Sequence, residues 1–384
     1  MPAMSPEEEA HSRAVAQFLG ERIRDAGGWL SFERFMELVL YAPGLGYYSA
    51  GGVKIGAGGD FVTAPEVSDL FSLCVARPCV QLLGDGGGEI LELGAGTGRM
   101  AATILESLAS QGVLPERYAI LEVSADLAAR QRERLAALPA KLFERVVWLE
   151  RLPRRAIRGV ILANEVLDAL PCRRFERAAG TFRELGVALV DGGLAERSRA
   201  ADETLASACR ALLDELPEPL PEGYVSEINL RVAPWIAGIG DCLERGAMLL
   251  FDYGLPRRHY YHPQRIAGTL RCHFKQRVHD DPYVNLGVQD ITAWVDFTRV
   301  AEAAIDCGLE VGGYTTQAGF LLAAGIEQWL AEPREPVARA RAAGEARRLL
   351  LPGEMGEAFK AMALTRGLDA PLAGFGLQDL RASL

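Results

Sequence analysis

The sequence has few lysines, an excess of acidic side chains and no long apolar run. Lys54, Lys141, Lys275 and Lys360 are the lysines among 41 basic residues, which face 51 acidic ones. The formal charge of −10 argues against nucleic acid or an anionic membrane surface as a partner, because both are negatively charged. No stretch reaches the roughly 18 apolar residues that a membrane-spanning helix requires. We therefore expect neither nucleic-acid binding nor membrane insertion.

The cysteines offer no disulfide framework. There are seven of them, an odd number, and none forms a Cys-x-x-Cys pair. Such a pattern is typical of free thiols in a reducing compartment. The acidic stretch 1–15 has no apolar signal region and no Arg-rich leader, so we expect a cytoplasmic protein.

Length and composition indicate a globular chain. With 384 residues, 49% of them hydrophobic and 24% charged, it can bury a sizeable core. Two domains, or one elaborated α/β domain, are both compatible with this length. Collagens, mucin-like stalks and disulfide miniproteins are excluded.

From residue 89 onward, short apolar strands alternate with helices. Strands are expected at residues 90–93, 118–122, 146–149, 159–164 and 247–251. This alternation is typical of a parallel sheet with helices on both faces. Residues 173–198 suggest antiparallel strands instead, and residues 254–289 lack clear elements, which is common in functional loops. Residues 290–308 read as a helix.

The strongest motif lies at the end of the first of these strands. Leu91-Glu-Leu-Gly-Ala-Gly-Thr-Gly98 places three glycines between a strand and a helix, where backbone can approach a ligand closely. A dinucleotide fingerprint has the spacing G-x-G-x-x-G, whereas Arg99 follows the last glycine here. Glu122 ends the next strand, where a carboxylate can accept both hydroxyls of a ribose. The combination favours a nucleoside-binding methyltransferase over a generic tight turn.

Two further segments carry polar side chains. Asn164-Glu-Val-Leu-Asp-Ala-Leu-Pro171 follows the fourth strand at the ligand-binding edge of such sheets, and a helical turn would put Glu165 and Asp168 on one face. Alternatively, Asp168 caps a helix and Glu165 is solvated. Residues 59–66 (Gly-Asp-Phe-Val-Thr-Ala-Pro-Glu) alone read as a turn before a helix.

The irregular segment 254–289 holds basic and aromatic residues around His273. A functional surface and a solvated basic loop fit this cluster about equally well. Its histidines show no convincing ligand spacing with an acid or a cysteine, so we expect no metal site. Glu227 is an acid beside an apolar residue, or simply the end of a surface strand.

Taken together, these motifs resemble the MidA-type class I S-adenosylmethionine-dependent methyltransferases. That family includes a mitochondrial complex I assembly factor that dimethylates an arginine of a complex I subunit. The resemblance covers nearly the whole chain, and its carriers are residues 41–48, 59–66, 91–98, 122–124, 164–171, 226–229, 251–254, 296–297 and 355–356. Ala95 and Leu230 depart from the family pattern, but neither change removes a chemical group.

The resemblance implies an α/β, Rossmann-like core with a mostly parallel seven-stranded sheet, an N-terminal helical segment and an inserted substrate-side subdomain. Residues 1–87 would form the cap and 88–384 the core, with inserts at about 172–230 and 254–290. S-adenosyl-L-methionine would be the cofactor. Its binding residues would be Asp60, Thr63, Glu92, Gly94, Ala95, Gly96, Gly98, Glu122, Val123 and Asn164.

The resemblance also implies the acceptor side. The candidate catalytic residues are Glu165, Asp168, Glu227 and His273. The resemblance also puts Asp252 and Tyr253 on the substrate side. A protein arginine, by analogy in a complex I subunit, is the implied acceptor, because carboxylates can grip a guanidinium bidentately. A small-molecule acceptor, another protein side chain and a non-catalytic cofactor-binding assembly factor stay open. A nicotinamide oxidoreductase is disfavoured by the glycine spacing. Apolar helix faces could serve a homodimer.

Overall fold

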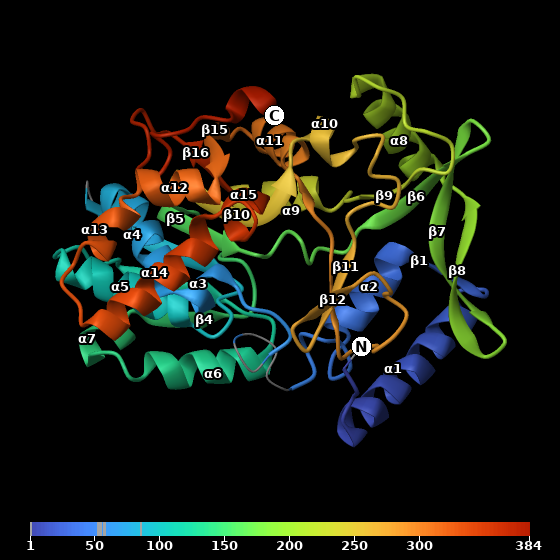
Figure 1. Cartoon of the computed structure of the whole chain (residues 1–384), viewed down its shortest axis with the longest axis horizontal. Coiled ribbons are helices and arrows are strands. Elements are labelled where there is room, and N and C mark those ends of the chain that lie inside the picture. The colour runs from blue at the N-terminus through green and yellow to red at the C-terminus, as the bar shows by residue number, and fades with distance from the viewer. Residues whose placement is uncertain (1, 52–55, 57–58, 85–86) are drawn as a thin grey trace.

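An eight-stranded sheet forms the centre of the larger lobe in the computed structural model, which describes residues 2–51, 56, 59–84 and 87–384 (Figure 1). Its strand order is β15-β16-β10-β5-β2-β3-β4, with β14 beside the end of β10. The strands are β2 (Glu89–Leu93), β3 (Arg117–Leu121), β4 (Val146–Leu149), β5 (Ile157–Asn164), β10 (Leu243–Leu255), β14 (Val295–Asp296), β15 (Glu310–Thr316) and β16 (Phe359–Arg366).

Most pairs of neighbouring strands in this sheet are parallel, and β16 is antiparallel to both β10 and β15. The predicted α/β fold with a mostly parallel seven-stranded sheet is thus confirmed, with β14 as a short addition. Because the strands are parallel, their carboxyl ends share one edge, where ligands bind in such folds.

Helices cover both faces of the sheet. One face carries α3 (Ala64–Val67), α4 (Asp69–Gly84), α5 (Arg99–Ser110), α6 (Ala125–Leu135), α7 (Ala140–Phe143), α12 (Gln317–Ala323), α13 (Ile326–Leu330), α14 (Pro336–Leu350) and α15 (Met355–Ala358). The other face carries α9 (Val232–Gly240) and α11 (Phe297–Asp306), near the final 3-10 turn η1 (Arg381–Ser383).

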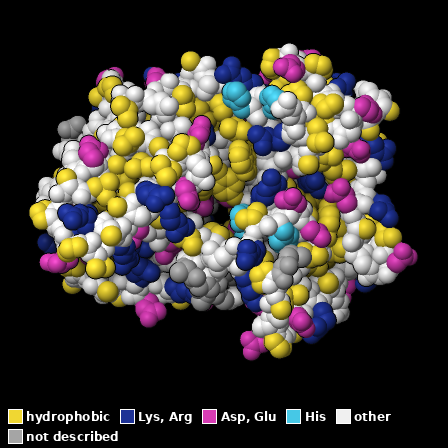
Figure 2. Space-filling model, viewed as in Figure 1, with side chains coloured by type: hydrophobic (Ala, Val, Ile, Leu, Met, Phe, Trp, Pro, Cys, Tyr) yellow, Lys and Arg dark blue, Asp and Glu magenta, His cyan; other side chains and the backbone are white. Residues whose placement is uncertain are grey.

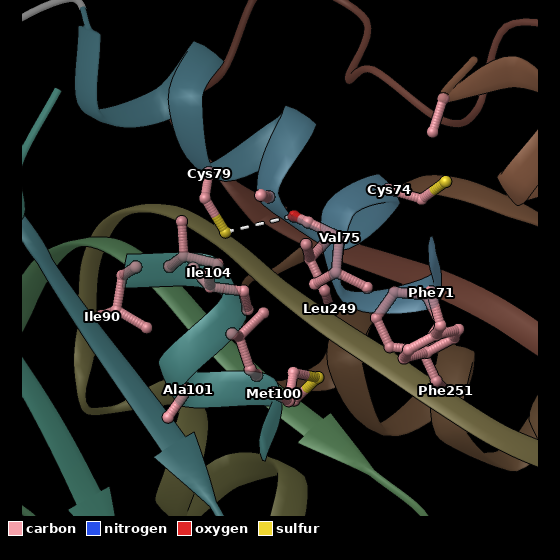
Figure 3. Packing of buried hydrophobic residues seen from close by; sticks show 14 of the residues in the cluster. Phe71, Cys74, Val75, Cys79, Ile90, Met100, Ala101, Ile104, Leu249 and Phe251 are labelled. Carbon is pink, nitrogen blue, oxygen red and sulfur yellow. Dashed lines mark hydrogen bonds between the residues drawn. The ribbon is translucent and has the colours of Figure 1, made fainter. Parts of the chain in front are cut away.

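The side chains of β10 point alternately to the two faces of the sheet, so this strand contributes to a hydrophobic cluster on each face. Leu249 packs with the helices of the first face, whereas its neighbours Met248 and Leu250 pack against the second. Figure 3 shows Leu249 and Phe251 facing α4 and α5, where the Cys79 thiol donates to the carbonyl of Val75 at 3.3 Å. All seven cysteines are free.

The smaller lobe is built from three separate stretches of the chain. Its five-stranded sheet has the order β1-β7-β6-β9 with β8 beside β7, and a three-stranded sheet has the order β12-β11-β13. The strands are β1 (Trp29–Ser31), β6 (Arg173–Ala178), β7 (Thr181–Val190), β8 (Gly193–Ala200), β9 (Val225–Ile228), β11 (Arg271–Phe274), β12 (Arg277–His279) and β13 (Asp290–Thr292). The helices are α1 (Pro6–Asp25), α2 (Phe32–Tyr41), α8 (Glu203–Glu215) and α10 (Arg257–Tyr260).

The N-terminal segment packs on the inserted strands. Side chains of α1 and α2 share a hydrophobic cluster with residues of β7, β11 and β13, as the neighbouring ribbons in Figure 1 suggest. By contrast, α4 belongs to the core cluster of the larger lobe. Residues 1–87 therefore contribute to both lobes, and a domain boundary at residue 87 stays a prediction.

One local prediction was wrong, and one short strand was missed. Residues 290–308 are not one helix, because β13 and β14 precede α11, whose N-cap is Asp296. The strand β1 was also missed, since its three residues are too short to show a period and form only by pairing with β7. None of the described helices has the length and apolarity that crossing a membrane demands.

Candidate active site

A cavity of about 330 Å³ opens at the carboxyl ends of β2, β3 and β5. Its wall includes Thr63, Glu122 and Asn164 from the larger lobe and Tyr41 and Tyr48 from the smaller lobe. Figure 2 shows the molecule hollowed between the two lobes, with hydrophobic side chains gathered beside the hollow.

The glycine loop forms one end of the cavity. Gly94, Gly96 and Gly98 have φ angles of 64°, 54° and 80°, in the left-handed region that favours glycine. Gly94, Ala95 and Gly96 line the cavity, whereas Gly98 is the N-cap of α5. A Cβ on Gly98 would come 3.4 Å from the Cα of Gln131, so this glycine allows α5 and α6 to pack closely.

Glu122 is held at the cavity by a network that the sequence did not reveal. Its carboxylate accepts from the Ser124 amide and from Gln131 Nε2, each at 2.9 Å. Gln131 Nε2 also donates to the Gly96 carbonyl at 3.0 Å, and Gln131 Oε1 accepts from the Trp148 indole at 3.0 Å. One buried amide therefore ties the glycine loop, Glu122 and β4 together.

Glu92 and Val123 line the same end of the cavity. Glu92 is buried and accepts from the Tyr118 hydroxyl at 2.7 Å. Burial, with a smaller contribution from Glu122, raises the pKa of Glu92 to about 7. Val123 is 74% exposed, so it offers an apolar surface at the rim.

Two of the predicted residues occupy different positions around residues 59–66. Thr63 lines the cavity, but Asp60 does not. The Asp60 carboxylate accepts from the Tyr47 hydroxyl at 2.9 Å and from the Lys275 amide at 2.7 Å. Asp60 thus fastens this loop to the turn between β11 and β12.

Glu165 and Asn164 both line the cavity. Glu165 has a φ of 53°, and its amide donates to the Phe251 carbonyl at 2.8 Å, which fixes the turn after β5. Its Oε1 accepts from the Ala64 amide at 3.4 Å and from Asn164 Nδ2 at 3.2 Å. Burial and, after it, the neighbouring Asp168 raise the pKa of Glu165 to about 8.

Asp168 and Asp252 lie behind this wall. Asp252 Oδ2 accepts from the amides of Leu167 at 2.9 Å and Asp168 at 3.2 Å, so it shapes the turn that carries Glu165. Burial raises the pKa of Asp168 to about 6, against the lowering effect of a hydrogen bond with Tyr253. The pKa of Asp252 is also raised, by burial and by the other two acids.

The structure does not bring Glu227 and His273 into the cavity wall. Glu227 is buried and accepts from the Thr269 amide at 2.7 Å and its hydroxyl at 3.0 Å, with Arg174 at 3.5 Å. His273 packs against the ring of Phe61, and burial lowers its pKa to about 4. Phe61 itself lines the cavity.

Comparisons with known proteins agree with a ligand site at this edge of the sheet. A family model described as S-adenosyl-L-methionine-dependent methyltransferase matches residues 74–315. A structure from Burkholderia thailandensis, bound to S-adenosyl-homocysteine, is 43% identical over 100% of both chains, with a TM-score of 0.95.

The chain belongs to this methyltransferase family.

The curated relatives have lower sequence identity to this chain, but the similarity extends along most of their length. The mitochondrial protein arginine methyltransferase NDUFAF7 of Danio rerio is 28% identical over 91% of this chain and 86% of its own. The Drosophila melanogaster homologue is 28% identical over 97% of this chain and 91% of its own.

The methyltransferase uses S-adenosyl-L-methionine as its cofactor, and the cavity fits that molecule. The glycine loop allows close approach, Glu122 can accept the ribose hydroxyls, and Val123 offers an apolar surface. Asn164 Oδ1 is buried and accepts no hydrogen bond from the described residues. A donor of the bound cofactor would satisfy that atom.

The prediction of a cytoplasmic protein is wrong. It is contradicted by the curated relatives, which are named as mitochondrial. Free cysteines show only that no disulfide is needed, and this condition holds in more than one compartment.

Sequence reasoning missed part of the wall. Tyr41, Tyr48, Phe61, Trp235 and Ile239 also line the cavity. The two tyrosines and Phe61 lie in segments on which the family resemblance rests. That resemblance was the one feature of the sequence that could have indicated their place in the cavity. Trp235 and Ile239 are four apart on α9, a spacing that also fits an ordinary buried helix face.

Proposed function

We propose that this methyltransferase transfers the methyl group to an arginine side chain of a protein. The observation that carries the proposal is the position of Glu165. Its carboxyl lines the cavity beside Asn164, and both of its hydrogen bonds from described residues go to Oε1. Oε2 is thus available to a donor entering the cavity.

The charge around Glu165 supports a cationic acceptor. Asp168 and Asp252 are buried close enough to raise pKa values in this group of acids. A guanidinium carries its positive charge on planar N–H groups that match a carboxylate, so it would restore the charge balance. The names of the curated relatives, which are protein arginine methyltransferases, agree with this choice.

The cofactor supplies an electrophilic methyl group on a sulfonium. A guanidinium is a poor nucleophile because it stays protonated near neutral pH. Oε2 of Glu165 would accept an N–H of one guanidinium nitrogen, hold that nitrogen in line with the methyl and take the proton that it loses. Asp252 would keep Glu165 in place through the turn at Leu167 and Asp168.

The test compares Glu165→Gln with Glu106→Gln, an exposed acid on α5. Each protein would receive methyl-labelled cofactor and an extract of cells that lack the enzyme. Glutamine keeps the shape of Glu165 but not its charge, so transfer should fall at least about 100-fold while S-adenosyl-homocysteine binding stays within about twofold. Glu106→Gln should behave as wild type.

Mass spectrometry of the labelled product separates the alternatives. We expect methylated arginine in a protein. Label in a small molecule or on another side chain would contradict the proposed acceptor. Cofactor binding without any transfer would point to a non-catalytic assembly factor, and full transfer by Glu165→Gln would remove Glu165 from the mechanism. A complex I-type acceptor and a homodimer remain predictions that the same product and a mass measurement in solution would test.

A further inference from the structure

The acceptor end of the cavity has two stacked tyrosines that come from the smaller lobe. The rings of Tyr41 and Tyr48 lie 5.5 Å apart at an angle of 20°, and both line the cavity. The Tyr41 hydroxyl donates to the Ala169 carbonyl at 2.9 Å. The Tyr48 hydroxyl donates to Asp290 Oδ1 at 3.0 Å. Each ring is therefore held in place by a hydrogen bond to a different lobe.

Asp290 reaches this position through strand pairing. It begins β13 and lies opposite His273 of β11. Its side chain is 2% exposed, and its Oδ1 also accepts from the Ile291 amide at 3.0 Å. Asp290 does not line the cavity, whereas Tyr48, which donates to it, does.

Asp290 is a fourth carboxyl beside Glu165, Asp168 and Asp252, and like the other two aspartates it is buried. None of the ion pairs formed by the described residues involves any of these four acids. Asp168 Oδ1 is buried and accepts no hydrogen bond within the described part of the chain. An acceptor cation would supply the positive charge that this region lacks.

Electrostatic coupling joins Asp290 to the same group. Burial and then Asp168 raise the pKa of Asp290 to about 8, and Asp290 in turn contributes to the raised pKa of Glu165. A cation bound at Tyr48 would lie near both acids and would favour their charged forms.

We propose that Tyr48 and Asp290 form a recognition pair for the cationic side chain of the acceptor. This inference rests on the arginine acceptor proposed above. Tyr48 contacts the acceptor, and Asp290 is a positioning residue that acts through Tyr48. The phenol donates its proton to Asp290, which leaves the oxygen lone pairs to accept from a guanidinium N–H. The ring face attracts the same cation.

The pair also explains why three separate segments meet here. Tyr48 comes from the N-terminal segment, Glu165 from the turn after β5 and Asp290 from the inserted strand β13. The core alone can build the cofactor end of the cavity, but the recognition of the acceptor requires both lobes.

The experiment measures binding of N-acetyl-L-arginine amide to the full-length protein saturated with S-adenosyl-homocysteine. N-acetyl-L-citrulline amide is the uncharged control, and N-acetyl-L-lysine amide tests a different cation. The variants are Tyr48→Phe, Asp290→Asn and the double variant. Tyr224→Phe and Asp241→Asn are matched controls, because Tyr224 is buried in another cluster and Asp241 is exposed.

We expect wild type to prefer the arginine probe over the citrulline probe. Each single variant should weaken arginine binding about tenfold, and the double variant should be little weaker than the single ones, because the two residues act as a unit. The affinity for S-adenosyl-homocysteine should stay within about twofold in all variants. If the two residues had a purely structural role, this affinity would fall together with arginine binding.

The other outcomes decide between the two proposals. Unchanged arginine binding in both variants, or an equal loss of cofactor affinity, would overturn the recognition pair and leave the proposed function standing. Equal binding of the citrulline probe by wild type would overturn both. A preference for the lysine probe that the variants weaken would overturn the arginine acceptor and support the pair as a site for an ammonium group.

Discussion

The two ends of the cavity are built in different ways. The cofactor end comes mainly from one continuous stretch, in which β2, the glycine loop, α5 and β3 follow each other along the chain. The acceptor end joins Tyr48, Glu165 and Trp235, which are far apart in sequence. Short-range geometry therefore fixes the first, and only the packing of two lobes fixes the second.

This difference matters for chemistry as well as for assembly. The cofactor end has glycines with fixed backbone angles and a carboxylate, Glu122, that accepts from two donors. At the acceptor end, Glu165 and Asp290 have raised pKa values because they are buried with other acids. The first end is ready to hold a neutral ribose, whereas the second gains most when a cation arrives.

The largest expected effect comes from breaking the cofactor end alone. Gly96→Asp adds a charged side chain to a loop residue that lines the cavity and has a φ of 54°. We expect at least about a 100-fold loss of S-adenosyl-homocysteine affinity in calorimetry. Gly112→Asp is the matched control, because Gly112 has a φ of 72° and an added Cβ there would meet open space. Equal binding by both variants would contradict the role of the loop.

A pH profile tests the acceptor end. The pKa of Glu165 is raised from 4.5 to about 8, chiefly by burial, so the carboxylate that grips a cation forms only as the pH rises. Methyl transfer should therefore increase about tenfold per pH unit below this pKa, and Glu165→Gln should abolish the rise. The folded state binds this proton more tightly than the unfolded one, so the free energy of unfolding should fall over the same range. A flat rate profile for wild type would exclude a titrating Glu165.

The smallest effect should come from the network behind the cofactor end. Gln131→Leu keeps a buried side chain of similar size but removes the hydrogen bonds to Glu122, Gly96 and Trp148. We expect S-adenosyl-homocysteine to bind about five- to tenfold more weakly, because Glu122 loses the hydrogen bond from Gln131 Nε2. Gln111→Leu, at the exposed C-cap of α5, should have no effect on this affinity. If Gln131→Leu also binds normally, the network serves stability alone.

Much of the cofactor end was visible in the sequence. Strand β2, its three glycines and Glu122 follow local rules of turn geometry and strand–helix alternation, and the structure places Gly94, Gly96 and Glu122 along the cavity. Asp290 was missed because it was assigned to a helix over residues 290–308. It belongs instead to a three-residue strand that exists only through its pairing with β11.

The sequence by itself determined the family, the parallel sheet and the loop that approaches the cofactor, because these depend on short-range patterns of glycine, acid and apolar residues. Tertiary structure decided which acids face the acceptor. It assigned Glu227 to a hydrogen-bonded structural position and brought Asp290 to Tyr48. The spacing of acids along a chain does not encode their distance in space, which the docking of two lobes sets.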